Sequence, residues 1–334
     1  MPRQNLGRSS EEMRNLLITP APQSEDFLVD AADWAELTAL LRANGMVSRQ
    51  DLARAVHRRS GFSEVTSLEK AGDAFSELAD RIDSCGAGSS ELSRYPFSLD
   101  SSGTLLTLKR PFRFNSNFGL LYWFLLFTSR ADMSSQARTL DHTDPTKVFE
   151  QLCADVLAEF WGGKSKFAGA MVVGTAGSGA RGTTQFKSKI AKLCENAGVG
   201  IGWKTGARAP GAGDAKLDVA AWRRFADKRQ GGLIGFAQCK TGIHWRDHLT
   251  TLQPETYCNR FFEQRPIIAP LRVYMVPHRI VLHRWDDHTS DGGILMDRCR
   301  ILQYGGHMSP AILKQCKRWL HAAYRLQKER RVTS

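Results

Sequence analysis

The stretch that decides the fold runs from Gly213 to Gly242 and reads GDAKLDVAAWRRFADKRQGGLIGFAQCKTG. It places Asp218 in a short apolar run, follows this with a polar turn, and continues into a second apolar run from Leu233 to Lys240. Apolar runs of this length, bounded by polar turns, predict two buried strands. Because alternate residues of a strand share a face, Gln238 and Lys240 are expected to point the same way.

The three polar side chains of this stretch suit the hydrolysis of a phosphodiester bond. Such a reaction uses hard oxygen ligands for Mg²⁺ and a cation near the attacking water or the scissile phosphate. Asp218 and Gln238 offer oxygens, and Lys240 offers the charge. An acid followed about twenty residues later by a polar-x-Lys pattern also arises by chance, in which case Lys240 is a solvated strand end.

From about Lys147 to Arg300 the chain resembles the PD-(D/E)xK nuclease superfamily, within it the restriction-endonuclease-like, Mrr-type branch, where Gln often replaces the second acid. The resemblance implies a mixed α/β sheet flanked by helices, Mg²⁺ or Mn²⁺ as cofactor, Asp218 as the metal-binding acid, Gln238 as the second motif position and Lys240 as the catalytic lysine. Two departures stand out. No Pro precedes Asp218, and the neutral amide of Gln238 binds Mg²⁺ more weakly than a carboxylate does.

The helix expected upstream of these strands contains one further candidate. In TKVFEQLCADVLAEFWGG, from Thr146 to Gly163, apolar residues recur at spacings of three and four, and Glu150 lies off that stripe. By the resemblance, Glu150 is the acid that this superfamily often has on its first core helix, and a third candidate metal ligand. The alternative is an ordinary solvated carboxylate.

Three residues are candidate nucleic-acid contacts. Arg181 lies near the end of the Gly-rich segment MVVGTAGSGARG, residues 171–182, which begins as a strand at Met171 and has neither the Walker A pattern nor a dinucleotide-binding context. It is interpreted as a phosphate contact on a loop beside the cleft. Trp245 and Arg246 follow the lysine motif and are interpreted as a stacking and phosphate-binding pair, although burial of Trp245 against the sheet is an equal alternative.

The chain before this region predicts a separate, mostly helical module. We expect a flexible leader over residues 1–29, a winged-helix-like module over 30–115, a bridge helix and linker over 116–145, and the nuclease-like domain over 146–334. Helical periodicity, a cap at Ser48 and a hairpin turn at residues 100–103 give three helices followed by two strands. Four arginines, at positions 49, 54, 58 and 59, form a basic face, yet the segment is acidic overall, so protein contact is an alternative to DNA contact.

Charge is distributed unevenly along the chain. Residues 1–110 contain 13 Lys and Arg against 16 Asp and Glu, whereas residues 111–334 contain 33 against 18, a net charge of +15. A field of that sign attracts a polyanion, and its coincidence with the candidate catalytic segment favours DNA as partner, with RNA an open alternative. Solubility alone is the other explanation for the charge.

Cysteine usage and hydropathy predict a cytoplasmic protein without membrane association. The seven cysteines are scattered, with no CxxC pair, and fit reduced thiols better than disulfides or zinc ligands. No secretory signal is visible at the N-terminus. The apolar run from Phe118 to Phe127 is about half the length that a bilayer span requires, so a buried helix is expected there.

The sequence therefore predicts a metal-dependent DNA endonuclease, with a role in defence against foreign DNA implied by the resemblance alone. Cleavage of both strands needs two sites and favours a homodimer. The absence of an ATPase motif leaves any nucleotide-driven step, or the trigger, to a partner protein. Two alternatives stay open: a catalytically inactive nucleic-acid-binding or scaffold protein that retains the nuclease fold, and an RNA-directed nuclease.

Overall fold

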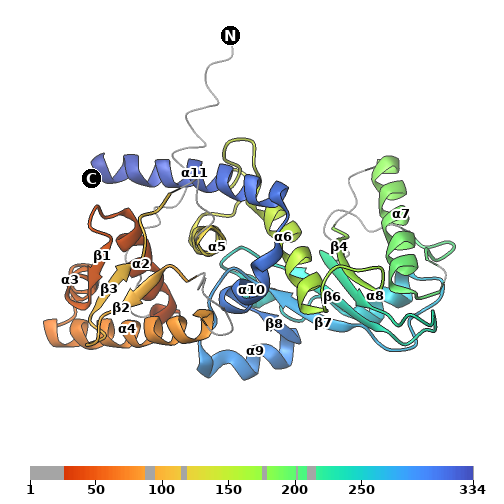
Figure 1. Cartoon of the computed structure of the whole chain (residues 1–334), viewed down its shortest axis with the longest axis horizontal. Helices are drawn as coiled ribbons and strands as arrows, with labels where there is room; N and C mark the ends of the chain where they lie inside the picture. The colour runs from red at the N-terminus through yellow and green to blue at the C-terminus, as the bar shows by residue number, and fades with distance from the viewer. Residues whose placement is uncertain are drawn as a thin grey trace, which may run out of the picture.

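Two sheets, one in each half of the chain, organise the fold. The structure is a computed structural model that describes residues 26–86, 95–113, 119–174, 179–200, 202–208 and 216–333. One sheet has three antiparallel strands and the other has five strands of mixed direction, with helices packed around both (Figure 1). The predicted mixed α/β class is confirmed.

The N-terminal region contains the predicted three helices and hairpin, together with one short strand that sequence analysis missed. This strand, β1, pairs antiparallel with β3 and gives the strand order β1-β3-β2. The first helix begins at Phe27, before the predicted boundary at 30, because Phe27 and Val29 are buried. The predicted leader otherwise covers residues 1–25, which lie outside the described residues. The elements are α2 (Phe27–Leu41), β1 (Met46–Ser48), α3 (Arg49–Ser60), α4 (Glu64–Gly86), β2 (Phe97–Leu99) and β3 (Leu105–Leu108).

Helix α3 shows how local sequence fixes an element here. The Ser48 hydroxyl accepts a hydrogen bond from the Asp51 N–H at 3.1 Å, and the Asp51 carboxylate accepts one from the Ser48 N–H at 3.0 Å. This reciprocal cap satisfies two backbone donors at the helix start. Gly61 ends the helix with φ 69°, a left-handed conformation that glycine adopts without steric cost. The capping-box prediction is confirmed.

A fully buried helix follows the N-terminal region. All eleven residues of α5 (Leu120–Arg130) are buried, and the helix packs against α10 and α11 near the middle of the molecule (Figure 1). The predicted buried helix is therefore present. Among the residues that the structure describes, no helix is long and apolar enough to cross a membrane.

The C-terminal half is built on the five-stranded sheet, in the order β4-β5-β6-β7-β8. Strand β5 runs antiparallel to both of its neighbours, β4 and β6, and β7 and β8 continue parallel to β6. Both strands predicted from the opening stretch are present as β5 and β6. The elements are α6 (Pro145–Phe160), β4 (Ala168–Val172), α7 (Gly179–Ala197), β5 (Val219–Arg223), β6 (Leu233–Cys239), η1 (Trp245–His248), α8 (Pro254–Phe261), β7 (Leu271–Met275), η2 (Leu282–Arg284), α9 (Trp285–Gly292), β8 (Ile294–Met296), α10 (Arg298–Tyr304), η3 (Gly305–His307) and α11 (Pro310–Thr333).

Each face of this sheet covers a separate apolar layer. Val219, Ala221 and Ala237 point into the large core that also contains α5 and α6. Ala220 and Phe236, one residue away along each strand, point into a second cluster formed with α7 and α8. This alternation is what two buried strands with period-two side chains require. The site described below lies where β5 begins and β6 ends.

A cluster of buried charges joins the two halves of the molecule, and we call its members Asp33, Glu36, Arg81 and Arg298 the inter-module cluster. Arg298 donates to both carboxylate oxygens of Asp33, at 2.7 and 2.9 Å. Arg81 lies 2.7 Å from Asp33 and 3.1 Å from Glu36, and all four side chains are 2% exposed or less. The hydroxyls of Tyr95 and Tyr122 donate to Glu36. Because every charge has a partner, the burial is tolerated.

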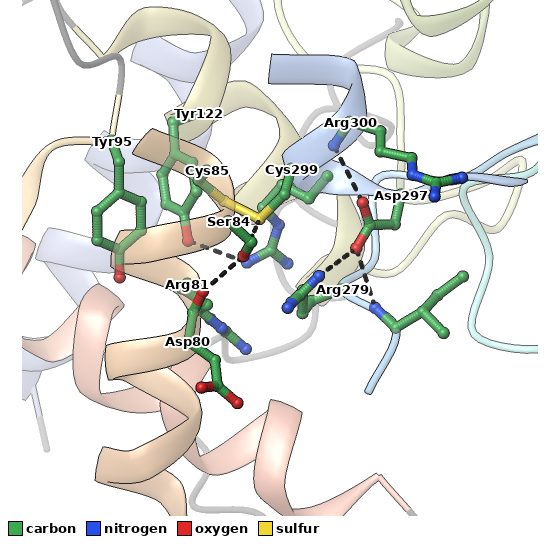
Figure 2. Close-up of a disulfide and its surroundings, with 12 residues drawn as sticks. Asp80, Arg81, Ser84, Cys85, Tyr95, Tyr122, Arg279, Asp297, Cys299 and Arg300 are labelled. Carbon is green, nitrogen blue, oxygen red and sulfur yellow. Dashed lines mark hydrogen bonds and ion pairs between the residues drawn. A yellow bond between two sulfur atoms is a disulfide. The ribbon is translucent and has the colours of Figure 1, made fainter. Parts of the chain in front are cut away.

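Asp297 and Arg298 are adjacent and both buried, yet Asp297 accepts a hydrogen bond from Arg279 at 2.8 Å while Arg298 faces Asp33. The expectation that the cysteines are all reduced thiols is wrong. Cys85 and Cys299 form a disulfide between α4 and α10, beside Arg279 and Asp297 (Figure 2). The two cysteines are 214 residues apart in the sequence, so their pairing could not be predicted from a local spacing pattern.

Candidate active site

Asp218 is held by its neighbours on both sides. Its N–H donates to the Ala237 carbonyl of β6 at 3.0 Å, and its carbonyl accepts from the Val173 and Gly174 N–H groups beyond β4. Its carboxylate accepts a hydrogen bond from the Cys239 N–H at 2.8 Å. The acid therefore lies at the start of β5 with its backbone fixed by two strands and its side chain turned toward the end of β6.

Glu150 reaches the same place from α6. A Cβ built on Gly174 would lie 4.0 Å from the Glu150 carboxylate and 3.9 Å from the Lys189 ammonium, so both side chains approach the chain just beyond β4. Burial raises the pKa of Glu150 to about 7, and the negative charges of Asp218 and Asp144 add to the rise. Glu150 thus turns toward Gly174 and is largely shielded from open solvent.

The pKa of Asp218, the other acid of the site, is also raised. Burial raises the pKa of Asp218, against the opposing effect of the Cys239 N–H and of the cations Lys240 and Lys216. Two carboxyls that share a buried site cannot both ionise freely, and such pairs cluster at functional sites. The pair would be relieved by a cation placed between them.

Lys240 lies directly after β6, where its N–H donates to the Met275 carbonyl at 3.0 Å. The preceding residue, Cys239, donates its N–H to the Asp218 carboxylate, and the charge of Lys240 lowers the pKa of both Glu150 and Asp218. Glu150, Asp218 and Lys240 are therefore brought together by three elements that are separated by up to ninety residues of sequence.

Lys189 joins this group, although the sequence analysis did not select it. The half-buried side chain donates to the Val173 carbonyl, and its charge lowers the pKa of Glu150. Helical periodicity could have identified Lys189. It falls three residues after Phe186 and four before Leu193, and so lies within the buried stripe of α7 rather than on its solvated face.

Gln238 is fully buried, and its amide is partly engaged. Its side-chain oxygen accepts from the Thr251 hydroxyl at 2.9 Å, and its Nε2 has no hydrogen-bond partner among the described residues. The β5–β6 ladder ends at the Val219 and Ala237 pair, and Asp218 and Gln238 are the next residues beyond it on either side. The second motif position is thus next to the acid, but one lone pair of its oxygen is already used.

The three predicted nucleic-acid contacts fare differently. Trp245 is only 1% exposed, and its ring packs against Tyr274, His278 and His288, so it cannot stack on a base, and that prediction is corrected. Arg246 lies over the Trp245 ring and pairs with Asp26 of the N-terminal region. The backbone of Arg181 belongs to α7, and its side chain lies outside the described part of the chain.

The residues present fit a hard cation only in part. Among the described residues, no group of three or more His, Cys, Asp or Glu side chains is placed to hold a metal ion. The set implied by the sequence consists of two carboxylates, Asp218 and Glu150, and the amide oxygen of Gln238. Mg²⁺ accepts such a small protein contribution because it usually keeps several waters and takes further oxygens from a phosphate. The raised pKa of each acid is consistent with a site that awaits positive charge.

Comparisons with known proteins add no further information about this site. No family model matches the chain, and neither the curated proteins nor the solved structures gave a significant match.

Proposed function

We propose that this chain is a Mg²⁺- or Mn²⁺-dependent nuclease that hydrolyses phosphodiester bonds in DNA. The observation that supports it best is the convergence of Glu150, Asp218 and Lys240 at one end of the five-stranded sheet, with the pKa of each acid raised. The order α6, β4, β5, β6, α8 and β7, with β5 antiparallel to its two neighbours and β7 parallel to β6, agrees with a restriction-endonuclease-like core into which α7 is inserted between β4 and β5.

In the proposed site each residue has a separate role. Asp218 and Glu150 would hold the metal, with Gln238 adding an amide oxygen, and the bound ion would supply Lewis-acid polarisation and a more acidic water. Lys240 places a positive charge beside the acids, where it would stabilise charge that develops on a phosphate. The Cys239 N–H fixes the carboxylate of Asp218, so that this group needs little reorganisation.

The N-terminal region is proposed to be a winged-helix-like module that serves structure or protein contact rather than DNA reading. Its order of helix, strand, two helices and hairpin agrees with that architecture. Helix α4, however, contains six acidic and two basic residues between Glu64 and Gly86. It also packs against α2, α3 and α10 and forms the disulfide through Cys85. An acidic, covered helix is unsuited to a phosphate backbone.

One observation favours a second candidate, a nucleic-acid-binding protein of the same fold without catalysis. The oxygen of Gln238 already accepts from Thr251, which leaves two carboxylates as the strong metal ligands. If that set is too weak, the chain binds DNA without cutting it. Calorimetric titration with Mn²⁺ separates the candidates, because the nuclease must bind the ion through Asp218 and the alternative need not.

The decisive experiment compares cleavage by the wild-type chain and by Lys240→Ala on plasmid, linear and single-stranded DNA, with and without Mg²⁺ or Mn²⁺. We expect metal-dependent cutting that falls by about 10²- to 10³-fold in the variant, the loss typical of removing one charge-stabilising group. Lys192→Ala, an exposed lysine of α7, is the matched control and should cut normally. Undiminished cutting by Lys240→Ala would disprove the assignment.

A further inference from the structure

Helix α11 presents a straight row of basic side chains to solvent. Lys314, Arg318, His321, Arg325 and Lys328 follow one another at spacings of four, three, four and three residues, and all five are exposed. At 100° per residue this spacing keeps them within a narrow arc on one side of the helix. We call these five residues the α11 stripe. With a rise of 1.5 Å per residue, it is about 21 Å long.

The composition of the helix is not that of an ordinary solvated surface. Between Pro310 and Thr333 there are seven Lys and Arg residues and a single acid, Glu329. Solvated helix faces usually interleave both signs, because like charges three or four residues apart weaken a helix. Within the stripe, Lys314 and Arg318 repeat one sign at that distance, and the ion pair of Arg318 with Asp141, at 3.5 Å, is exposed and offsets little of the repulsion.

The opposite side of α11 shows that the stripe does not belong to a membrane-binding helix. Cys316, Trp319, Leu320 and Ala323 are fully buried, and they pack into the same core as α5. A helix that lies in a lipid interface needs a free apolar face to insert. Here that face is occupied by the protein itself, so the stripe offers charge and no insertion surface.

The stripe begins beside the helix that holds Glu150. The Ser309 N–H, just before α11, donates to the Asp155 carboxylate of α6 at 3.0 Å. The Trp319 indole donates to the Arg138 carbonyl, just before α6, at 2.8 Å. From there α11 runs across the top of the molecule toward the N-terminal helices (Figure 1). A long polyanion bound along α11 therefore passes close to α6.

We infer that the α11 stripe is a binding track for the phosphate backbone of duplex DNA, distinct from the residues that would cut it. The length of the stripe matches the axial rise of about six base pairs, at 3.4 Å each. Long, exposed Lys and Arg side chains contact phosphates without reading bases, so binding along the stripe is independent of sequence. The inference rests on the proposed function for the identity of the polyanion, and it assigns that function an extended duplex substrate.

The test measures binding of a fluorescein-labelled 30-base-pair duplex to the full chain by anisotropy, in EDTA so that no cleavage occurs, over a range of salt concentrations. The variant Lys314→Gln/Arg318→Gln/Arg325→Gln removes three cations from the stripe. The matched control, Arg54→Gln/Arg58→Gln/Arg59→Gln, removes the same charge from the exposed face of α3. Because all six side chains are exposed, both variants should fold, which circular dichroism checks.

We expect the stripe variant to bind at least tenfold more weakly at 0.1 M salt, and the slope of log K against log salt to fall by about 2.7, since each phosphate contact contributes about 0.9. The control should lose less than threefold. Equal losses in both variants, an unchanged slope, no binding by the wild type, or binding to anionic vesicles in preference to DNA would each overturn the inference. Loss of cleavage in the Lys240→Ala experiment is a separate readout, so failure of the stripe and failure of the nuclease assignment are distinguishable.

Discussion

The inter-module cluster and the candidate active site are both groups of buried charges, yet they are balanced differently. In the cluster, Arg298 and Arg81 outweigh burial and hold the pKa of Asp33 well below its usual value, whereas burial raises the pKa of Glu36. Each of these carboxyls nonetheless has Arg81 within 3.1 Å. In the site, burial raises the pKa of Glu150 to about 7 although Lys189 and Lys240 are near. The first arrangement satisfies its own charges and stabilises the fold. The candidate active site has too little positive charge for its two carboxyls, which favours the binding of a cation.

The largest effect is expected from breaking the balanced region. Arg298→Met leaves Asp33 and Glu36 buried with too few cations, and removing one partner of a buried ion pair costs about 3–5 kcal/mol. We expect the free energy of unfolding, measured by urea denaturation, to fall by that amount. Arg318→Met is the control, because the exposed pair of Arg318 with Asp141 contributes less than about 1 kcal/mol. Similar losses in the two variants would remove the distinction between a structural cluster and a surface pair.

The covalent link beside the cluster is expected to matter somewhat less. In non-reducing buffer, Cys85→Ser/Cys299→Ser should lower the free energy of unfolding by about 2–4 kcal/mol, the usual contribution of a disulfide. With dithiothreitol the wild type and the variant should unfold at the same urea concentration. Mass spectrometry of the alkylated, unreduced wild type decides whether the bond forms, since labelling of both cysteines would contradict it.

The smallest expected effect on stability comes from Glu150 in the candidate active site, and it depends on pH. The pKa of Glu150 rises from 4.5 to about 7 on folding, so the folded state binds its proton more tightly than the unfolded state does. Without metal, stability should therefore fall as pH rises from about 4.5 to 7, by an amount on the order of 1–2 kcal/mol for a half-buried group. Urea denaturation of the wild type and Glu150→Gln in EDTA at pH 5 and pH 8 checks this. If Glu150→Gln shows the same pH dependence of the free energy of unfolding as the wild type, groups other than Glu150 cause that dependence.

Local sequence predicted the elements of the site better than their surroundings. The strands β5 and β6, and the helix containing Glu150, follow from runs and periodicities within twenty residues, and all three are present. The burial of Trp245 depends on Tyr274, His278 and His288, which come from later segments, so the sequence left it undecided. The same holds for the pairing of Asp33 with Arg298, whose 265-residue separation has no local signature.

That separation also bears on the order in which the protein can be made. Asp33 and Arg81 leave the ribosome more than 200 residues before Arg298 is synthesised. Until then, Asp33 lacks the arginine that pairs with both of its carboxylate oxygens in the folded protein. Contacts between distant segments form late in folding, and domains otherwise tend to fold in order of synthesis. The N-terminal module therefore reaches its final packing only when α10 has been translated, and fragments that end before Arg298 should not fold as independent units.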